Sequence, residues 1–219
     1  MNSPIIQLLV LAGIAVFLIL RLRGGLGTRE GYEIPAVTRP EPYRRSAPEF
    51  DVIEGGPDLD ITDHVEEDSA AAKALAAMKR VDPTFSVGEF LGGARGAYEM
   101  ILMAFEKGDL DQIVPFISED VYEAFASVVD ERQRQGLTVE ANFIGISDMS
   151  LAAAEFDEAT KEGEVSVRFK SEMTSVVRDN GGDIVEGSDK EIKRQKDTWT
   201  FQRKMDAGDP NWKLVATGE

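Results

Sequence analysis

The chain has 219 residues, with no cysteine, one histidine and a formal net charge of −16. The missing cysteines exclude a disulfide framework, a thiolate nucleophile and cysteine-ligated metal sites, and the single histidine, His64, argues against His-rich metal sites and Ser-His catalysis. A count of 40 acidic against 24 basic residues argues against a general nucleic-acid-binding surface, which requires a cationic footprint.

The first predicted element is an apolar segment near the N-terminus. Residues 4–20 read PIIQLLVLAGIAVFLIL and carry no charge. A helix of this length spans ~25 Å, close to the ~30 Å hydrocarbon core of a bilayer. The segment lacks the positive n-region and the small-residue cleavage site of a signal peptide. We therefore expect residues 1–22 to form a retained transmembrane anchor.

The residues that follow this segment predict its orientation and a tether. Residues 21–45 contain six Arg and three Glu, and basic flanks stay on the cytoplasmic side of a membrane. We therefore expect the N-terminus outside and the body of the chain in the cytoplasm. Residues 23–61 are rich in Gly, Pro and Arg and follow neither a helix nor a strand period, which predicts a flexible linker.

Three helices are predicted next. Residues 62–81 have an acidic start, an alanine-rich middle and a basic end, which predicts an amphipathic helix. Its apolar face is modest, so we expect it either to dock weakly on the domain or to contact a partner. A second helix is expected after Ser86, a predicted N-cap, and should end at Gly108. A third is expected from Ser118, also a predicted N-cap, to Gly136.

After Gly136 the hydrophobic period changes to two, which is typical of strands. The alternating residues lie at 139–143, 165–169, 199–203 and 212–216. Turn residues separate them, at 161–163, 180–182, 187–189 and 208–211. Helices followed by hairpin-linked strands predict an α+β domain over residues 82–219, with helices covering one face of an antiparallel sheet.

Motifs for catalysis and metal binding are not found. The sequence holds no HExxH, P-loop or EF-hand pattern. Gly92-Gly93 lies inside a helical pattern, so we interpret it as close packing against a neighbouring element rather than a phosphate-binding loop. Trp199, Phe201 and Trp212 are interpreted as core residues on one strand face. We therefore predict no catalytic, metal-binding or cofactor-binding residues, and no cofactor.

One stretch is locally basic within the acidic body. Residues 190–204 hold six Lys and Arg against Glu191 and Asp197. This pattern is typical of a solvated strand face, and a site for an acidic partner or a lipid headgroup is the alternative. The candidate patch consists of Lys193, Arg194, Lys196 and Lys204.

Five short motifs follow one another between Asp82 and Thr217. They are Asp82-Pro83-Thr84-Phe85, Phe90-Leu91-x-Gly93-Ala94-Arg95, Ala104-Phe105-x-x-Gly108-Asp109, Asp197-x-Trp199-x-Phe201-x-Arg203 and Asp209-Pro210-Asn211-Trp212-x-Leu214-Val215-Ala216-Thr217. In order and spacing they resemble the Tim44-like domain family, which contains the import-motor adaptor of the mitochondrial inner membrane and bacterial, membrane-anchored relatives. The resemblance implies a cone-shaped fold of the nuclear-transport-factor type, with helices packed on a curved antiparallel sheet.

The resemblance also implies an adaptor rather than an enzyme. We expect a bacterial inner-membrane protein whose cytoplasmic domain binds a protein partner, such as a chaperone or a translocation or envelope component, or an apolar segment. The implied apolar hollow would be built around Phe90, Tyr98, Trp199 and Phe201.

Two alternatives stay open. The first is a cofactor-free isomerase or dehydratase, whose sign would be a carboxylate that is buried in the hollow beside a Tyr and has a raised pKa. The second is a lipid-handling domain that holds an acyl chain in the same hollow.

Overall fold

The fold is that of a computed structural model, which describes residues 58–218. The predicted anchor, residues 1–22, and most of the predicted linker, residues 23–61, lie outside the described residues. The described elements are α2 (Leu59–Thr62), α3 (Ala70–Val81), α4 (Val87–Lys107), the 3₁₀ helix η1 (Asp111–Phe116), α5 (Glu119–Arg134), β1 (Thr138–Phe156), β2 (Glu162–Arg178), β3 (Ile184–Lys204) and β4 (Lys213–Gly218). Within this range, none of the helices combines the length and the apolar character that crossing a membrane requires.

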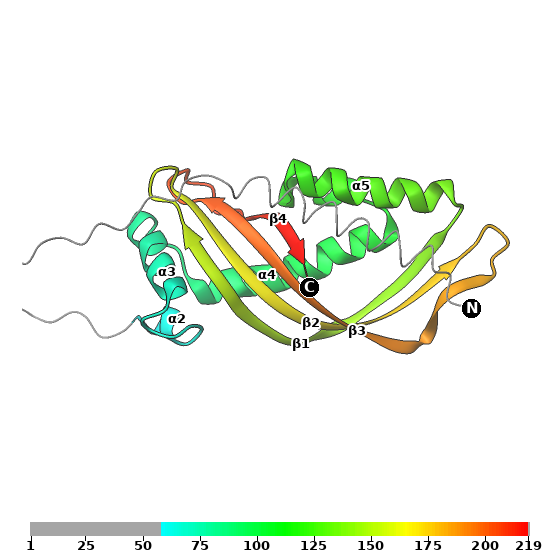
Figure 1. The fold of residues 1–219 in the computed structure, drawn as a ribbon, viewed down its shortest axis with the longest axis horizontal. Helices are drawn as coiled ribbons and strands as arrows, with labels where there is room; N and C mark the ends of the chain where they lie inside the picture. Colours follow the sequence, from blue (N-terminus) through cyan, green and yellow to red (C-terminus); the bar gives the residue numbers. More distant parts are fainter. Residues whose placement is uncertain (1–57, 219) are drawn as a thin grey trace, which may run out of the picture.

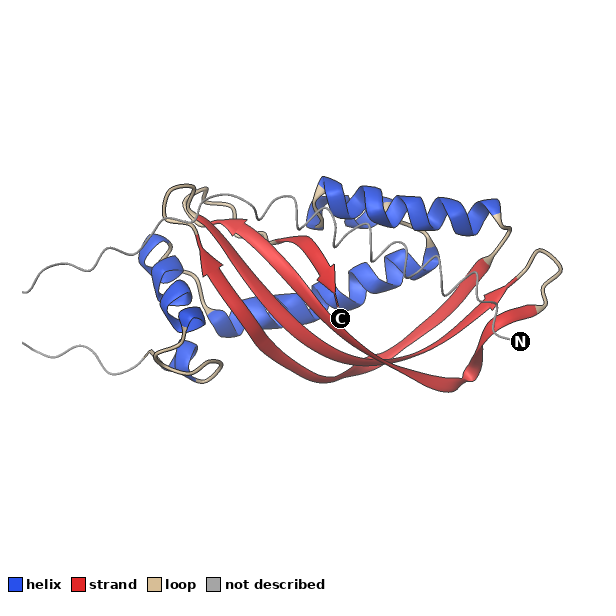
Figure 2. Cartoon of the chain, viewed as in Figure 1, coloured by secondary structure: helices blue, strands red, loops and turns tan. Residues whose placement is uncertain are grey.

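The four strands form one antiparallel sheet in the order β1-β2-β3-β4, which confirms the predicted α+β class. The sheet is strongly curved, and α4 lies along its concave side, as Figure 1 shows. Figure 2 shows the helices gathered on that side, so the convex side is not covered by any helix of the described chain. The concave face of the sheet therefore packs against the core, whereas the convex face is open to solvent or to a partner.

The strands are longer than the sequence pattern predicts, and one predicted turn is part of a strand. Residues 187–189 lie inside β3, where Ser175 of β2 pairs with Ser188 and the next pair is Met173 with Lys193. Gly187 has φ +77°, and a Cβ at this position would meet the Ser175 carbonyl oxygen at 2.0 Å. Irregularities of this kind bend a strand and increase its twist, so this one contributes to the curvature of the sheet.

The helix boundaries follow local capping. The hydroxyls of Ser86 and Ser118 accept hydrogen bonds from the backbone N–H groups of Glu89 and Val121, which confirms both predicted N-caps. Gly108 ends α4 in the left-handed conformation, with φ +73°, as predicted. Each cap satisfies backbone groups that a helix end leaves without a partner.

The segment predicted as one helix over 62–81 is divided in the structure. The short α2 ends at Thr62, and α3 begins only after Ser69, whose hydroxyl accepts from the Ala72 N–H. Leu75 and Met78 of α3 are fully buried in the main core. The expected weak docking of this helix is therefore wrong, because its narrow apolar face is wholly used against the domain.

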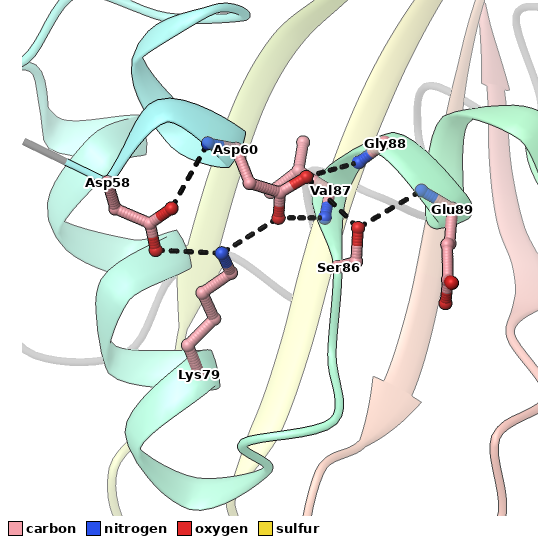
Figure 3. Close-up of polar contacts among 7 residues, drawn as sticks. All are labelled: Asp58, Asp60, Lys79, Ser86, Val87, Gly88 and Glu89. Carbon is pink, nitrogen blue, oxygen red and sulfur yellow. Dashed lines mark hydrogen bonds and ion pairs between the residues drawn. The ribbon is translucent and has the colours of Figure 1, made fainter.

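A polar network joins α2 and α3 to the start of α4 (Figure 3). The Asp60 carboxylate accepts from the Val87 and Gly88 N–H groups, at 2.7 and 2.9 Å. The Lys79 ammonium lies 2.7 Å from Oδ2 of both Asp58 and Asp60. A residue of α2 thus caps α4. Through this cap and the Lys79 ion pairs, α2 and α3 are attached to the rest of the domain.

The glycines of α4 are not in close contact with a neighbour. A Cβ at Gly92, Gly93 or Gly96 would have no atom of another element within 4 Å. The interpretation of Gly92-Gly93 as a close-packing contact is therefore wrong within the described residues. Glycine is tolerated inside a helix, so its presence there does not by itself require a close neighbour.

Candidate functional site

The four side chains predicted to line a hollow are brought together by the fold. Phe90 and Tyr98 come from α4, and Trp199 and Phe201 come from β3. The rings of Phe90 and Phe201 are 6.0 Å apart, and those of Tyr98 and Trp199 are 4.6 Å apart. All four side chains are at most 7% exposed. They pack against one another in the core, and a ligand-holding hollow between them stays a prediction.

A polar group lies in the middle of this aromatic cluster. The Tyr98 hydroxyl donates to Asp197 Oδ2 at 2.5 Å and lies 2.8 Å from the Ser171 hydroxyl. Burial raises the pKa of Tyr98 above its ordinary value, and the bond to the Asp197 carboxylate raises it further, against a smaller opposite effect of Ser171. Tyr98 is therefore neutral at physiological pH and acts as a hydrogen-bond donor.

A second cluster joins the start of α4 to the end of the sheet. The Arg203 guanidinium forms an ion pair with Asp82 and lies 5.9 and 5.5 Å from the ring centres of Phe85 and Trp212. Phe90 packs against Trp212, with ring centres 4.7 Å apart. The Asp82 carboxylate accepts from Thr84, and this bond and the Arg203 charge hold the pKa of that carboxyl below its usual range.

These two clusters explain the spacing of the family motifs. Asp197, Trp199, Phe201 and Arg203 alternate along β3, so all four point to the concave face and meet residues of or near α4. The alternating residues of this β3 motif therefore build the helix–sheet junction. Asp197 and Ser171 were not predicted as partners of Tyr98, although Asp197 lies on the same period-two face of β3 as Trp199.

The predicted basic patch is divided between the two faces of the sheet. Lys193 is on the concave face, because it pairs with the buried Met173 and lies four positions before Asp197, on the same face of β3. Arg194, Lys196 and Lys204 are exposed on the convex face. The four residues thus do not form one patch, since neighbouring positions of a strand point in opposite directions.

Two residues of β2 join the convex part. Lys170 is the direct register partner of Lys196, and Arg168 follows two positions along β2, on the same face. We call Arg168, Lys170, Arg194 and Lys196 the convex basic cluster. Its β2 members could not be found from the sequence, because they depend on the pairing register of strands that are far apart in the chain.

Lys193 belongs instead to a charged group on the helix side. Burial raises the pKa of Glu106, at the end of α4, while the nearby charges of Arg132 and Lys193 oppose that shift. Arg132, from α5, stacks at 4.6 Å on the Phe105 ring and donates to the Phe105 carbonyl oxygen. Charged side chains of α4, α5 and β3 therefore meet near the C-terminal end of α4.

No group of three or more His, Asp or Glu in residues 58–218 is arranged to hold a metal ion. An open pocket of about 530 Å³ lies at the β1–β2 turn, and it is lined by acidic side chains and one ring, namely Glu155, Phe156, Asp157, Glu158, Glu162 and Glu164. Neither the aromatic cluster nor the convex basic cluster contributes to it.

Comparison with protein families gives one match over most of the domain. The sequence model of the Tim44-like domain matches residues 71–219. The match begins within α3 (Ala70–Val81) and runs to residue 219.

Comparison with individual proteins gives the same family name. Over 148 residues, which is 66% of the chain and 32% of the relative, it is 26% identical to the human mitochondrial import inner membrane translocase subunit TIM44. It is 22% identical over 161 residues to subunit TIM44-1 of Arabidopsis thaliana, covering 71% of the chain and 34% of the relative. The chain thus corresponds to about a third of the length of these relatives.

Among solved structures, the intermembrane-space region of the chloroplast protein ARC6 matches with a TM-score of 0.40 and 11% identity. The match covers 58% of the chain and 94% of that structure.

Proposed function

Because the chain belongs to the Tim44-like domain family, we propose that it is a membrane-anchored adaptor whose α+β domain binds a protein partner. The match of residues 71–219 to this family is the observation that carries the proposal. The relatives in human and Arabidopsis are named as subunits of an inner-membrane translocase, which supports a protein partner for this chain as well. We further propose the cone-shaped, nuclear-transport-factor-like form of the fold, which the curved sheet with helices on one side supports.

The proposed anchor is the apolar segment within residues 1–22. Its uncharged residues 4–20 and the six Arg among residues 21–45 support a single span, with the N-terminus outside and the domain in the cytoplasm of a bacterial inner membrane. The linker then keeps the domain within a few tens of ångströms of the membrane, at a high local concentration.

We propose a structural and binding role for the aromatic cluster, not a catalytic one. The Tyr98–Asp197 contact places a carboxylate beside a Tyr, which is one part of what the enzyme alternative requires. The Tyr98 side chain, however, is fully buried, stacked at 4.3 Å on Phe169, and its hydroxyl is already bonded to Asp197 and Ser171. A general acid must reach a substrate, and this geometry leaves the hydroxyl no free approach. The contact instead supports a stabilising role.

The partner is proposed to be a chaperone or a translocation or envelope component that works at the same membrane. The chain spans only about a third of the length of the translocase subunits, so no role of their remaining residues is assigned to it. The alternative function is a lipid-handling domain that holds an acyl chain in the predicted hollow. Lipid that co-purifies with the full chain would favour this alternative.

Chemical cross-linking in intact membranes tests the proposal. Amine-reactive cross-linkers applied to cells with the full chain would attach at exposed lysines of the domain, such as Lys73, Lys107 and Lys213. We expect recurrent protein adducts, identified by mass spectrometry, on the domain lysines. Turnover of a small molecule by the purified chain, with no protein adduct on the domain, would contradict the adaptor function.

A further inference from the structure

The centre of the convex face concentrates positive charge. The convex basic cluster consists of Arg168 and Lys170 on β2 and Arg194 and Lys196 on β3. Lys170 lies directly opposite Lys196, and the two arginines are each one same-face position away. Side chains at directly opposed positions have Cβ atoms about 5 Å apart, so the four cations share one small surface.

Only half of this charge is neutralised by the protein. Lys170 forms an ion pair with Asp148 at 2.7 Å, and Arg194 forms one with Glu172 at 2.9 Å. Neither Arg168 nor Lys196 has an ion-pair partner among the described residues. Four cations and two carboxylates leave a local balance of +2, whereas residues 58–218 hold 33 acidic and 18 basic residues, a balance of −15.

Folding by itself does not explain this arrangement. Like charges directly opposed in a sheet are destabilising. The Arg194 and Lys170 side chains are 82% and 47% exposed, so burial of their stems gives little in return. No helix of the described chain covers this face (Figure 2). The cluster is therefore accessible and complementary to a negatively charged partner.

Resting on the proposed adaptor function, we propose that the convex basic cluster binds an acidic segment of the protein partner. A short acidic segment can place its carboxylates over the cations alone. An anionic bilayer, in contrast, is an extended surface that would also face the many acidic side chains around the cluster, and charges interact across roughly 8 Å at physiological salt. Charge complementarity thus favours a local acidic segment over a membrane surface.

A peptide-binding measurement with matched variants tests this site. The full chain in neutral-lipid nanodiscs is titrated into a fluorescein-labelled deca-glutamate peptide, and binding is followed by fluorescence anisotropy. The test variant Arg168→Gln/Lys196→Gln removes the two cations that form no ion pair, and it leaves the Lys170–Asp148 and Arg194–Glu172 ion pairs in place. The control variant Lys73→Gln/Arg95→Gln removes one exposed Lys and one exposed Arg from α3 and α4, with the same change in net charge.

We expect the test variant to weaken peptide binding by about tenfold, the control by less than about twofold, and wild-type binding to fall as salt rises. Unchanged thermal unfolding would show that both variants are folded. The proposal is overturned if the wild-type chain does not bind the peptide, or if both variants lose affinity equally.

The membrane is distinguished by repeating the titration in nanodiscs that contain phosphatidylglycerol. Retained peptide binding supports the proposal, and loss of binding in these discs would assign the cluster to anionic lipid and overturn it. Failure of the adaptor function is a separate result. If cross-linking in membranes finds a partner that Arg168→Gln/Lys196→Gln binds as well as wild type does, the cluster is not its site, while the adaptor function stands.

Discussion

The contact between Tyr98 and Asp197 shows how single polar residues specify the helix–sheet junction. A hydroxyl buried among rings is costly unless it is hydrogen-bonded, and here both Ser171 and Asp197 bond to it. Arg203 and Asp82 likewise satisfy each other, as an ion pair whose side chains are only 9% and 18% exposed. At the scale of the residue, both pairs connect α4 or its approach to the same face of β3.

For the first pair, we predict that Tyr98→Phe lowers the free energy of unfolding by about 1–3 kcal/mol, because Ser171 and Asp197 each lose a buried bond. Urea denaturation measures it. Tyr122→Phe is the matched control, since the Tyr122 hydroxyl forms no hydrogen bond within the described residues, and its effect should be below about 0.5 kcal/mol. Equal effects of the two changes would show that the Tyr98 bonds do not stabilise the domain.

For the second pair, we predict a loss of about 2–4 kcal/mol in Arg203→Met, because Asp82 is left without its cation and two rings lose the guanidinium. The neighbouring Lys204→Met removes an exposed cation whose nearest carboxylate is 3.9 Å away, and should cost below about 0.5 kcal/mol. Thermal and urea unfolding compare the two. A similar small loss in both would mean that the Arg203 cluster is dispensable.

At the scale of the element, α4 is held by a cap from another helix and carries exposed glycines along its length. At the start of α4, the Asp60 carboxylate accepts hydrogen bonds from backbone N–H groups that would otherwise bond to water (Figure 3). Burial acts to raise the pKa of Asp60, but hydrogen bonds from Lys79, Gly88, Val87 and Ser86 outweigh it and lower the pKa well below the ordinary range. The attachment of α2 and α3 is thus linked to pH.

The sign of this linkage follows from the lowered pKa. Asp60 contributes stability that is complete above the unfolded-state pKa of about 4 and is lost as pH falls through the lower folded-state pKa. We predict that Asp60→Asn lowers the free energy of unfolding at neutral pH and makes it fall less steeply below about pH 4 than in wild type. Urea denaturation across pH 2–7 measures both slopes, and parallel curves would contradict the role of Asp60.

The change from Gly to Ala is predicted to have opposite effects on stability at Gly96, inside α4, and at Gly108, the residue that caps its C-terminus. At Gly96, Ala meets no neighbour within 4 Å, so it should raise the free energy of unfolding by about 0.5–1 kcal/mol through helix propensity. At Gly108, φ is +73° and a Cβ would lie 3.2 Å from Val129, so the same change should destabilise by about 1 kcal/mol or more. Destabilisation by Gly96→Ala would reveal a contact on the exposed face of α4.

At the scale of the whole molecule, the features that the sequence predicted correctly are local ones. The caps at Ser86 and Ser118 and the left-handed Gly108 depend on residues within one turn, and the α+β class depends on a change of period. The candidate sites depend on register instead. Asp197 reaches Tyr98 across 99 residues, and Lys196 meets Lys170 only because β2 and β3 pair as they do. A period-two pattern identifies faces, but it does not say which faces become neighbours.

The adaptor function combines an anchor, a tether and a domain that binds a protein, and its central claim is that the anchor brings the partner to the membrane. The most direct measurement compares the partner recovered by cross-linking in the membrane fraction of cells that carry either the full chain or residues 23–219. The account predicts that the full chain enriches the partner in membranes and that the shorter chain, although folded, leaves the partner in the soluble fraction. Equal recovery in membranes from both chains would contradict it.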